Sequence, residues 1–220
     1  MELDIDGLDP EGRGLGRDRG LEIHVAGALP GDHISAEVEH RSPHRPEAWA
    51  RLLGIERSSP DRVAGSCPAT GRCGGCPLGA LGYPAQQAWK ARRLERLLAP
   101  LNHVPDVFVP APSALGYRGQ AKLVYGRDAR SGEVCLGAYA PRSHDIVDLA
   151  GCRVVEPVLE SVRAALLAAL RSAGVTPYEE RKNDGLLAYV VLRANVDARV
   201  LVTLVGSDLD ELARLASEHD

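Results

Sequence analysis

Three cysteines fall within ten residues, Cys67-Pro-Ala-Thr-Gly-Arg-Cys73-Gly-Gly-Cys76. The spacing C-x5-C-x2-C can bring three thiols to one point, and Gly74 and Gly75 let the backbone fold tightly around whatever the thiols hold. A fourth thiol would close a four-ligand site, and Cys152 is the best candidate. The stretch therefore predicts a metal centre with the ligands Cys67, Cys73, Cys76 and Cys152.

Other uses of the cysteines are weaker explanations. The acidic residues 1–6 do not resemble a signal peptide, so we expect a cytoplasmic protein, where structural disulfides are rare. An odd number of cysteines, five, also fits a disulfide framework poorly. Zinc stays open, because thiolates suit both zinc and iron–sulfur clusters, although the x5 arm favours the bulkier cluster. Cys135 lies in an alternating stretch and is expected to be a small buried strand residue.

The overall charge does not indicate a nucleic-acid protein, but its distribution leaves that class open. Lysine and arginine number 26 against 30 acidic residues, a net charge of −4. Basic residues nevertheless outnumber acidic ones between residues 86 and 130, a pattern compatible with phosphate contact or with ordinary solvated surface. No apolar run approaches the length of a membrane span, so no membrane partner is expected.

The first sixty residues read as short strands separated by glycine-rich turns, which predicts a small β-barrel. The stretch Asp9–Gly16 is expected to be a turn, since it lacks the spacing of a phosphate-binding loop and no helix follows it. The strands expected from alternation are Glu2–Ile5, Leu21–Val25, His33–Glu39 and Ala48–Glu56.

The remainder of the chain predicts helices mixed with hairpins. We expect hairpins formed by Gly119–Tyr125 with Glu133–Tyr139 and by Leu186–Arg193 with Arg199–Val205. Helices are expected over Pro84–Leu98, over Pro157–Ala173, and up to Glu218 after a capping pair of Ser207 and Asp210. The fold class is thus α+β, with three predicted domains: a barrel over 1–60, a cysteine loop over 61–82 and an α+β domain over 83–220.

Several segments together resemble the N-terminal half of the RNA uracil-5-methyltransferases that modify 23S ribosomal RNA. The likeness to the family's TRAM domain, an OB-like RNA-binding barrel, lies in two early segments, and the cysteine loop follows a matching linker. The segments that carry the resemblance are Asp9–Gly16, Val25–Gly31, Ser59–Val63, Cys67–Cys76, Gln87–Lys90, Gly116–Arg118, Ala121–Leu123 and Gly137–Asp148.

The resemblance implies a structural 4Fe-4S cluster, with Cys152 at the position of the fourth ligand. In the family, a C-terminal Rossmann-like domain supplies the S-adenosylmethionine site and a cysteine nucleophile in a Ser-Cys-Asn-Pro-like segment. Neither motif occurs in these 220 residues. No catalytic residue is therefore assigned, and the chain by itself is expected not to methylate RNA.

Several origins for this arrangement remain open. The chain is either a truncated methyltransferase, one half of a split enzyme whose catalytic domain is a separate polypeptide, or a free-standing RNA-binding protein with a 4Fe-4S or zinc site. An iron–sulfur electron carrier is the alternative from another class, although the barrel and the basic helix would have no role in a carrier.

The resemblance also implies an RNA partner, with large-subunit ribosomal RNA as the preferred target. Single-stranded loops are the expected target class, because a uracil must be unstacked before its C6 atom can be reached. Phosphate contacts are expected from basic side chains, and stacking or hydrogen bonding from one tyrosine and one histidine. The predicted RNA-binding residues are Arg13, Arg17, Lys90, Arg92, Arg93, Tyr117, Arg118, Lys122, Arg142 and His144.

Overall fold

The computed structural model describes residues 1–65 and 67–217, and these divide into two compact units. The first unit comprises Met1–Ser66 and Gly75–Ala111, and the second comprises Cys67–Gly74 and Pro112–Asp220. This division runs through the loop domain expected over 61–82, and it places the helix that follows the loop with the barrel.

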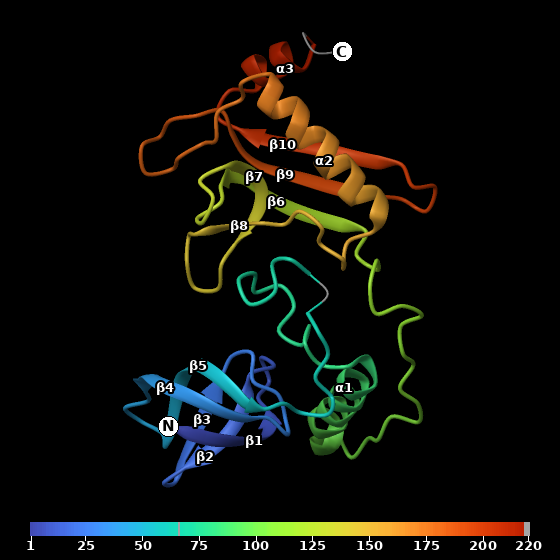
Figure 1. Ribbon diagram of the computed structural model, residues 1–220. Coiled ribbons are helices and arrows are strands. Elements are labelled where there is room, and N and C mark those ends of the chain that lie inside the picture. The colour runs from blue at the N-terminus through green and yellow to red at the C-terminus, as the bar shows by residue number, and fades with distance from the viewer. Residues whose placement is uncertain (66, 218–220) are drawn as a thin grey trace. The chain divides into compact units, whose positions relative to one another are not determined.

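The first unit is built on a closed five-stranded barrel, in the order β1-β2-β3-β5-β4 (Figure 1). Inward side chains such as Leu3, Ile5 and Ile23 are buried, and they alternate with polar residues that face outward. The barrel predicted from sequence is therefore confirmed. Its strands are β1 (Glu2–Leu8), β2 (Gly14–Asp18), β3 (Leu21–Val25), β4 (His33–Arg41) and β5 (Glu47–Arg57).

Strand β2 corrects the expectation that the whole of Asp9–Gly16 is a turn. The turn ends at Arg13, where the buried Asp9 carboxylate accepts the backbone N–H groups of Glu11 and Arg13, each at 2.9 Å. Gly12, with φ of +83°, supplies the left-handed conformation that this turn requires. From Gly14 the chain pairs with both β1 and β3.

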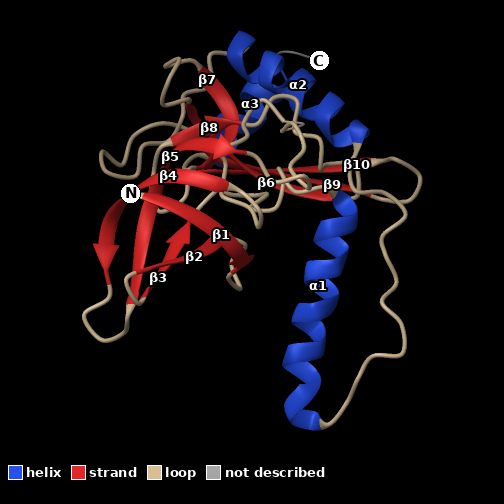
Figure 2. Cartoon of the chain, turned by 60° about the horizontal axis from the view of Figure 1, so that its bottom comes forward, coloured by secondary structure: helices blue, strands red, loops and turns tan. Residues whose placement is uncertain are grey.

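A smaller apolar cluster joins the barrel to helix α1 (Tyr83–Leu98). Leu8, Leu29 and Leu81 are buried there, with Ala85 and Trp89 of α1 packed against them. Pro84 stands in the first turn of the helix, where its missing N–H leaves no bond unmade. Figure 2 shows α1 as one continuous helix followed by a long loop.

The second unit is a five-stranded sheet with helices on one face. Its order is β10-β9-β6-β7-β8, and neighbouring strands are antiparallel. This agrees with the predicted α+β class. The elements are β6 (Gln120–Arg127), β7 (Val134–Tyr139), β8 (Ile146–Asp148), α2 (Pro157–Ser172), β9 (Leu187–Ala194), β10 (Val200–Gly206) and α3 (Leu209–Ser217).

Helix α2 covers one face of this sheet (Figure 1). Leu159 and Leu170 of α2 pack against Leu123, Leu136 and Leu192, all buried within one core. Because strand side chains alternate between faces, the residues between these core positions lie on the opposite face of the sheet. That second face carries the polar and aromatic side chains of interest below.

The remaining sequence expectations have mixed outcomes. Both hairpins and the helices over 84–98 and 157–173 are confirmed to within two residues, while β8 was not anticipated. The last helix is capped by Asp208, whose carboxylate accepts the Glu211 N–H at 2.9 Å, rather than by Ser207, whose hydroxyl donates to the Gly185 carbonyl. Glu218, the expected end of this helix, lies outside the described residues.

Across residues 1–65 and 67–217, the helices are too short or too polar for any of them to span a lipid bilayer.

Candidate cysteine centre and nucleic-acid surface

The residues from Cys67 to Cys73 fold into consecutive tight turns. The Thr70 backbone N–H and hydroxyl both donate to the Cys67 carbonyl, at 3.0 and 2.7 Å. The Cys73 N–H donates to the carbonyl of the buried Ala69 at 2.9 Å. These turns keep the backbone between Cys67 and Cys73 compact, and two ligands of one site must lie close together.

Asp128 anchors this loop to the sheet. Its carboxylate is 3.3 Å from the Arg72 guanidinium and also accepts backbone N–H groups from Arg130, Ser131 and Asp148, at 2.9 to 3.0 Å. The N–H groups of Asp148 and Ser131, and then the nearby Arg72 charge, hold the pKa of Asp128 far below its ordinary range. One buried carboxylate thus connects the cysteine loop with the strand that leads towards Cys152.

The Cys152 segment meets the cysteine loop within the same unit. A Cβ atom built on Gly151 would lie 3.5 Å from Pro68, so the chain neighbours of Cys152 and Cys67 lie close together. The Glu160 carboxylate accepts the Gly151 N–H at 2.9 Å and fixes the turn there. A Cβ on Gly74 would lie 2.7 Å from Pro141, which explains glycine at that position.

The four predicted thiol ligands are contributed by both units. Across residues 1–65 and 67–217, no group of three or more histidine, cysteine, aspartate or glutamate side chains is placed to hold a metal ion. Cys67, Cys73 and Cys152 belong to the second unit and are partly buried, while Cys76 belongs to the first and is exposed. The donor set suits a soft metal centre, so the four-cysteine site stays a prediction.

Cys135 has the buried position that the sequence predicts. It lies on β7 with 1% of its surface exposed, and burial followed by the charges of Asp148 and Asp128 raises its pKa to about 12. A thiol that stays protonated at neutral pH is a poor ligand and a poor nucleophile.

The predicted RNA-binding residues of the first unit differ in whether their side chains already have partners within the protein. Arg13 is paired with Asp9 at 2.5 Å and with Glu11 at 2.8 Å, so much of its charge is neutralised locally. Arg93 lies over the Trp89 ring, 5.4 Å from its centroid, and donates to the Pro10 carbonyl. The other predicted RNA-binding residues of this unit are exposed, and they are Arg17, Lys90 and Arg92.

The predicted residues of the second unit are all exposed. The Arg118 backbone is fixed by hydrogen bonds to Val154 and Glu156, which leaves its side chain at the surface. Lys122 projects from β6, and its ammonium lies 4.2 Å from the centre of the Tyr189 ring. Tyr117, Arg142 and His144 lie on loops, with the His144 ring edge-on to Tyr139 at 5.6 Å.

Sequence reasoning missed the partners of Lys122 on the open face of the sheet. Tyr189 and Arg193 belong to β9 and share that face with Lys122, because Tyr189 pairs with Val124 and Arg193 with Gln120. Strand alternation within 189–193 contained the signal, since Val190 and Leu192 mark the core side. The pairing of β6 with β9 joins residues some seventy positions apart and could not be read locally.

Comparison with known proteins finds sequence relatives, although no protein-family model matches the chain. An RNA methyltransferase of Geobacter sulfurreducens, itself uncharacterized, is 32% identical over 98% of this chain and 44% of its own length. A 23S rRNA (uracil(1939)-C(5))-methyltransferase of Pectobacterium carotovorum is 31% identical over 85% of this chain and 43% of its own length.

The chain is similar to RNA methyltransferases over most of its length. A solved RNA methyltransferase supports this at the level of structure: the Pyrococcus abyssi tRNA (uracil-54, C5)-methyltransferase, determined with S-adenosyl-L-homocysteine, matches with a TM-score of 0.73 and 26% identity. That match covers 98% of this chain and 48% of the Pyrococcus chain. The chain thus spans less than half the length of the RNA methyltransferases that it matches.

Proposed function

We propose that this chain is the RNA-recognition portion of an S-adenosylmethionine-dependent RNA uracil-5-methyltransferase that acts on large-subunit ribosomal RNA. The observation that carries the proposal is similarity to RNA methyltransferases over 98% of the chain, through both the barrel unit and the sheet unit. The ribosomal target is preferred because one relative is named for its action on 23S rRNA. Methyl transfer is expected to need the part of those relatives that the chain does not match.

The second part of the proposal is a 4Fe-4S cluster held by Cys67, Cys73, Cys76 and Cys152. The closeness of Pro68 to Gly151 supports it, because these residues are the chain neighbours of two of the ligands. The cluster, when bound, would supply a covalent cross-link between distant parts of the sequence rather than chemistry on the RNA. Arg72 and Asp128 would hold the loop in place whether or not the cluster is present.

RNA would be bound mainly through phosphates, with unpaired bases stacked on aromatic side chains. In the second unit, Arg118 and Lys122 offer exposed charges from elements that are fixed by backbone hydrogen bonds. Tyr117, Arg142 and His144 extend the same kind of surface from loops. A cation on a rigid strand loses less freedom on binding than one on a mobile segment, so these two are expected to contribute most.

Salt-dependent binding to fragments of 23S rRNA tests the proposal. We expect the dissociation constant to rise steeply with salt, and Arg118→Ala to weaken binding and reduce the salt slope by about one phosphate contact. The matched control is Arg130→Ala, because Arg130 is also exposed but lies beyond the far end of β6, about 25 Å away along the strand.

Three results would contradict the proposal. These are no binding to ribosomal RNA fragments at low salt, affinity that does not respond to salt, and equal effects of the two arginine substitutions. The first two would remove the assigned function, and the third would remove the assigned surface.

A further inference from the structure

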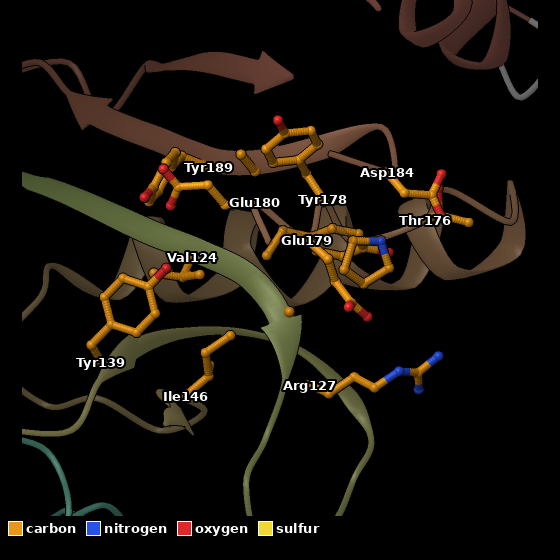
Figure 3. Close-up of a pocket in the computed structure, with 15 residues that line it drawn as sticks. Val124, Arg127, Tyr139, Ile146, Thr176, Tyr178, Glu179, Glu180, Asp184 and Tyr189 are labelled. Carbon is orange, nitrogen blue, oxygen red and sulfur yellow. The ribbon is translucent and has the colours of Figure 1, made fainter. Parts of the chain in front are cut away.

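A pocket of about 580 Å³ opens at one end of the exposed sheet face in the second unit (Figure 3). Its floor is formed by Val124 and Gly126 of β6 and by Ala188 of β9, and one wall by the turn over residues 176–185. This volume falls within the range that accommodates a small organic group and is too small for a folded segment. None of the predicted RNA-binding residues lines it.

Two tyrosine side chains, Tyr139 and Tyr189, line this space (Figure 3). Burial, and then a hydrogen bond with the neighbouring Tyr189 side chain, raises the pKa of Tyr139. Tyrosine faces are platforms on which unpaired nucleobases stack, at little cost in side-chain entropy.

A carboxylate points into the same space. In Figure 3 the Glu180 side chain lies beside Tyr189, and its charge also influences Tyr139. Over the part of the chain that the structure describes, no hydrogen bond or ion pair engages this carboxylate, whereas the neighbouring Glu179 is paired with Lys182 at 2.6 Å. An ionised carboxylate only accepts hydrogen bonds, so its ligand must present N–H or O–H donors.

The surrounding charges decide how a nucleotide would enter. Lys122 stands next to Tyr189 outside the pocket, where it can meet a phosphate, while Glu180 would repel a phosphate from the interior. The base would therefore enter beside the tyrosines, with the phosphate remaining at Lys122. Among bases, guanine presents two adjacent donors, N1–H and N2–H, which match the two oxygens of one carboxylate.

We propose that this pocket binds one unpaired guanine of the RNA, stacked on Tyr139 next to Tyr189 and hydrogen-bonded to the Glu180 carboxylate. The inference rests on the proposed RNA-binding function and adds base selectivity to it. Uracil is disfavoured because its single N–H donor lies between two carbonyl oxygens, which would face the carboxylate. The guanine is thus a second recognition element, separate from any uracil that is modified.

Fluorescence anisotropy with the full chain and three short oligouridines tests this inference. The RNAs differ only at one central position, which is guanosine, inosine or adenosine. We expect the guanosine RNA to bind about tenfold more tightly than the inosine RNA, which lacks the 2-amino donor. Glu180→Gln should abolish this preference, while Glu95→Gln, a matched change at an exposed site on α1, should retain it.

Tyr139→Leu separates stacking from hydrogen bonding. Tyr139 is 40% exposed, so its loss leaves the core intact, and circular dichroism melting confirms folding. We expect this variant to bind the guanosine RNA about tenfold more weakly than the unaltered chain.

The failure of this inference is distinguishable from failure of the proposed function. RNA binding without preference for guanosine, or a preference that survives in Glu180→Gln, would overturn the pocket assignment and leave the proposed function standing. Binding of an arginine-rich peptide that depends on Glu180, without guanosine preference, would likewise reassign the pocket to a protein partner. No binding to any of the three RNAs would overturn both.

Discussion

Replacing Asp128 with alanine should loosen the cysteine loop and destabilise the second unit. The substitution removes the acceptor of three backbone N–H groups and the partner of Arg72. Hydrogen bonds to a charged group contribute roughly 1.5–3 kcal/mol each, but the backbone at Arg130 and Ser131 is exposed, so water can replace two of the three. We therefore estimate a loss of about 3 kcal/mol in the free energy of unfolding, which lowers Tm by about 6–12 °C for a chain of this size.

Circular dichroism melting measures the stability change, and alkylation followed by mass spectrometry measures exposure of the thiols. We expect Asp128→Ala to speed alkylation of Cys67 and leave that of the strand residue Cys135 unchanged. Arg72→Ala is the matched control: it removes only a partly exposed ion pair, so its effect should stay below about 1 kcal/mol. Equal melting temperatures for Asp128→Ala and the unaltered chain, or equal effects of the two substitutions, would refute this account of the anchor.

The same carboxylate gives the stability a definite dependence on pH. Backbone N–H groups depress the pKa of Asp128 in the folded state, while in the unfolded chain it is about 3.9. Its contribution is therefore complete above about pH 5 and is lost as the pH falls below about 4 towards the folded pKa. Asp128→Asn should flatten this acid limb of a plot of Tm against pH, and an unchanged limb would contradict the assignment.

Three further predictions concern other residues. Cys135→Ser should leave metal content unchanged while lowering Tm slightly, since this buried thiol is no ligand; loss of metal in this variant, measured by elemental analysis, would reassign it. Arg62→Ala should destabilise the barrel unit by about 3 kcal/mol, because it leaves the fully buried Asp32 carboxylate without its guanidinium partner; urea unfolding that is unchanged would argue against this buried pair. Lys122→Met should weaken RNA binding at low salt and reduce the salt slope by about one contact; an identical slope would exclude Lys122 from the phosphate surface.

Local pattern was sufficient for most of the strands and helices. Alternation marked the barrel strands, and the apolar spacing of residues 158–170 marked α2. Strand β2 was missed because its glycines were interpreted as turn residues, whereas glycine is needed there for close packing. A Cβ on Gly16 would lie 2.6 Å from the Asp4 carbonyl, so this strand needs glycine to fit against β1. A three-residue strand such as β8 carries too little pattern to be recognised.

The site was predictable where one short segment carries it and not where distant segments meet. The cysteine loop is visible as a motif, whereas Asp128 reads from sequence as an ordinary turn residue. Its role depends on Arg72 and Asp148, which both contact it in the fold although they are more than seventy positions apart in the sequence. The guanine pocket combines residues of β6, β7 and β9 with the turn before β9, so tertiary pairing alone creates it.

Iron and acid-labile sulfide, measured per chain after anaerobic purification, test the cysteine centre most directly. The account predicts a brown protein with about four iron and four sulfide ions per chain, and loss of both in Cys73→Ser. A colourless protein that contains zinc, or iron retained in full by the Cys73→Ser variant, would contradict it.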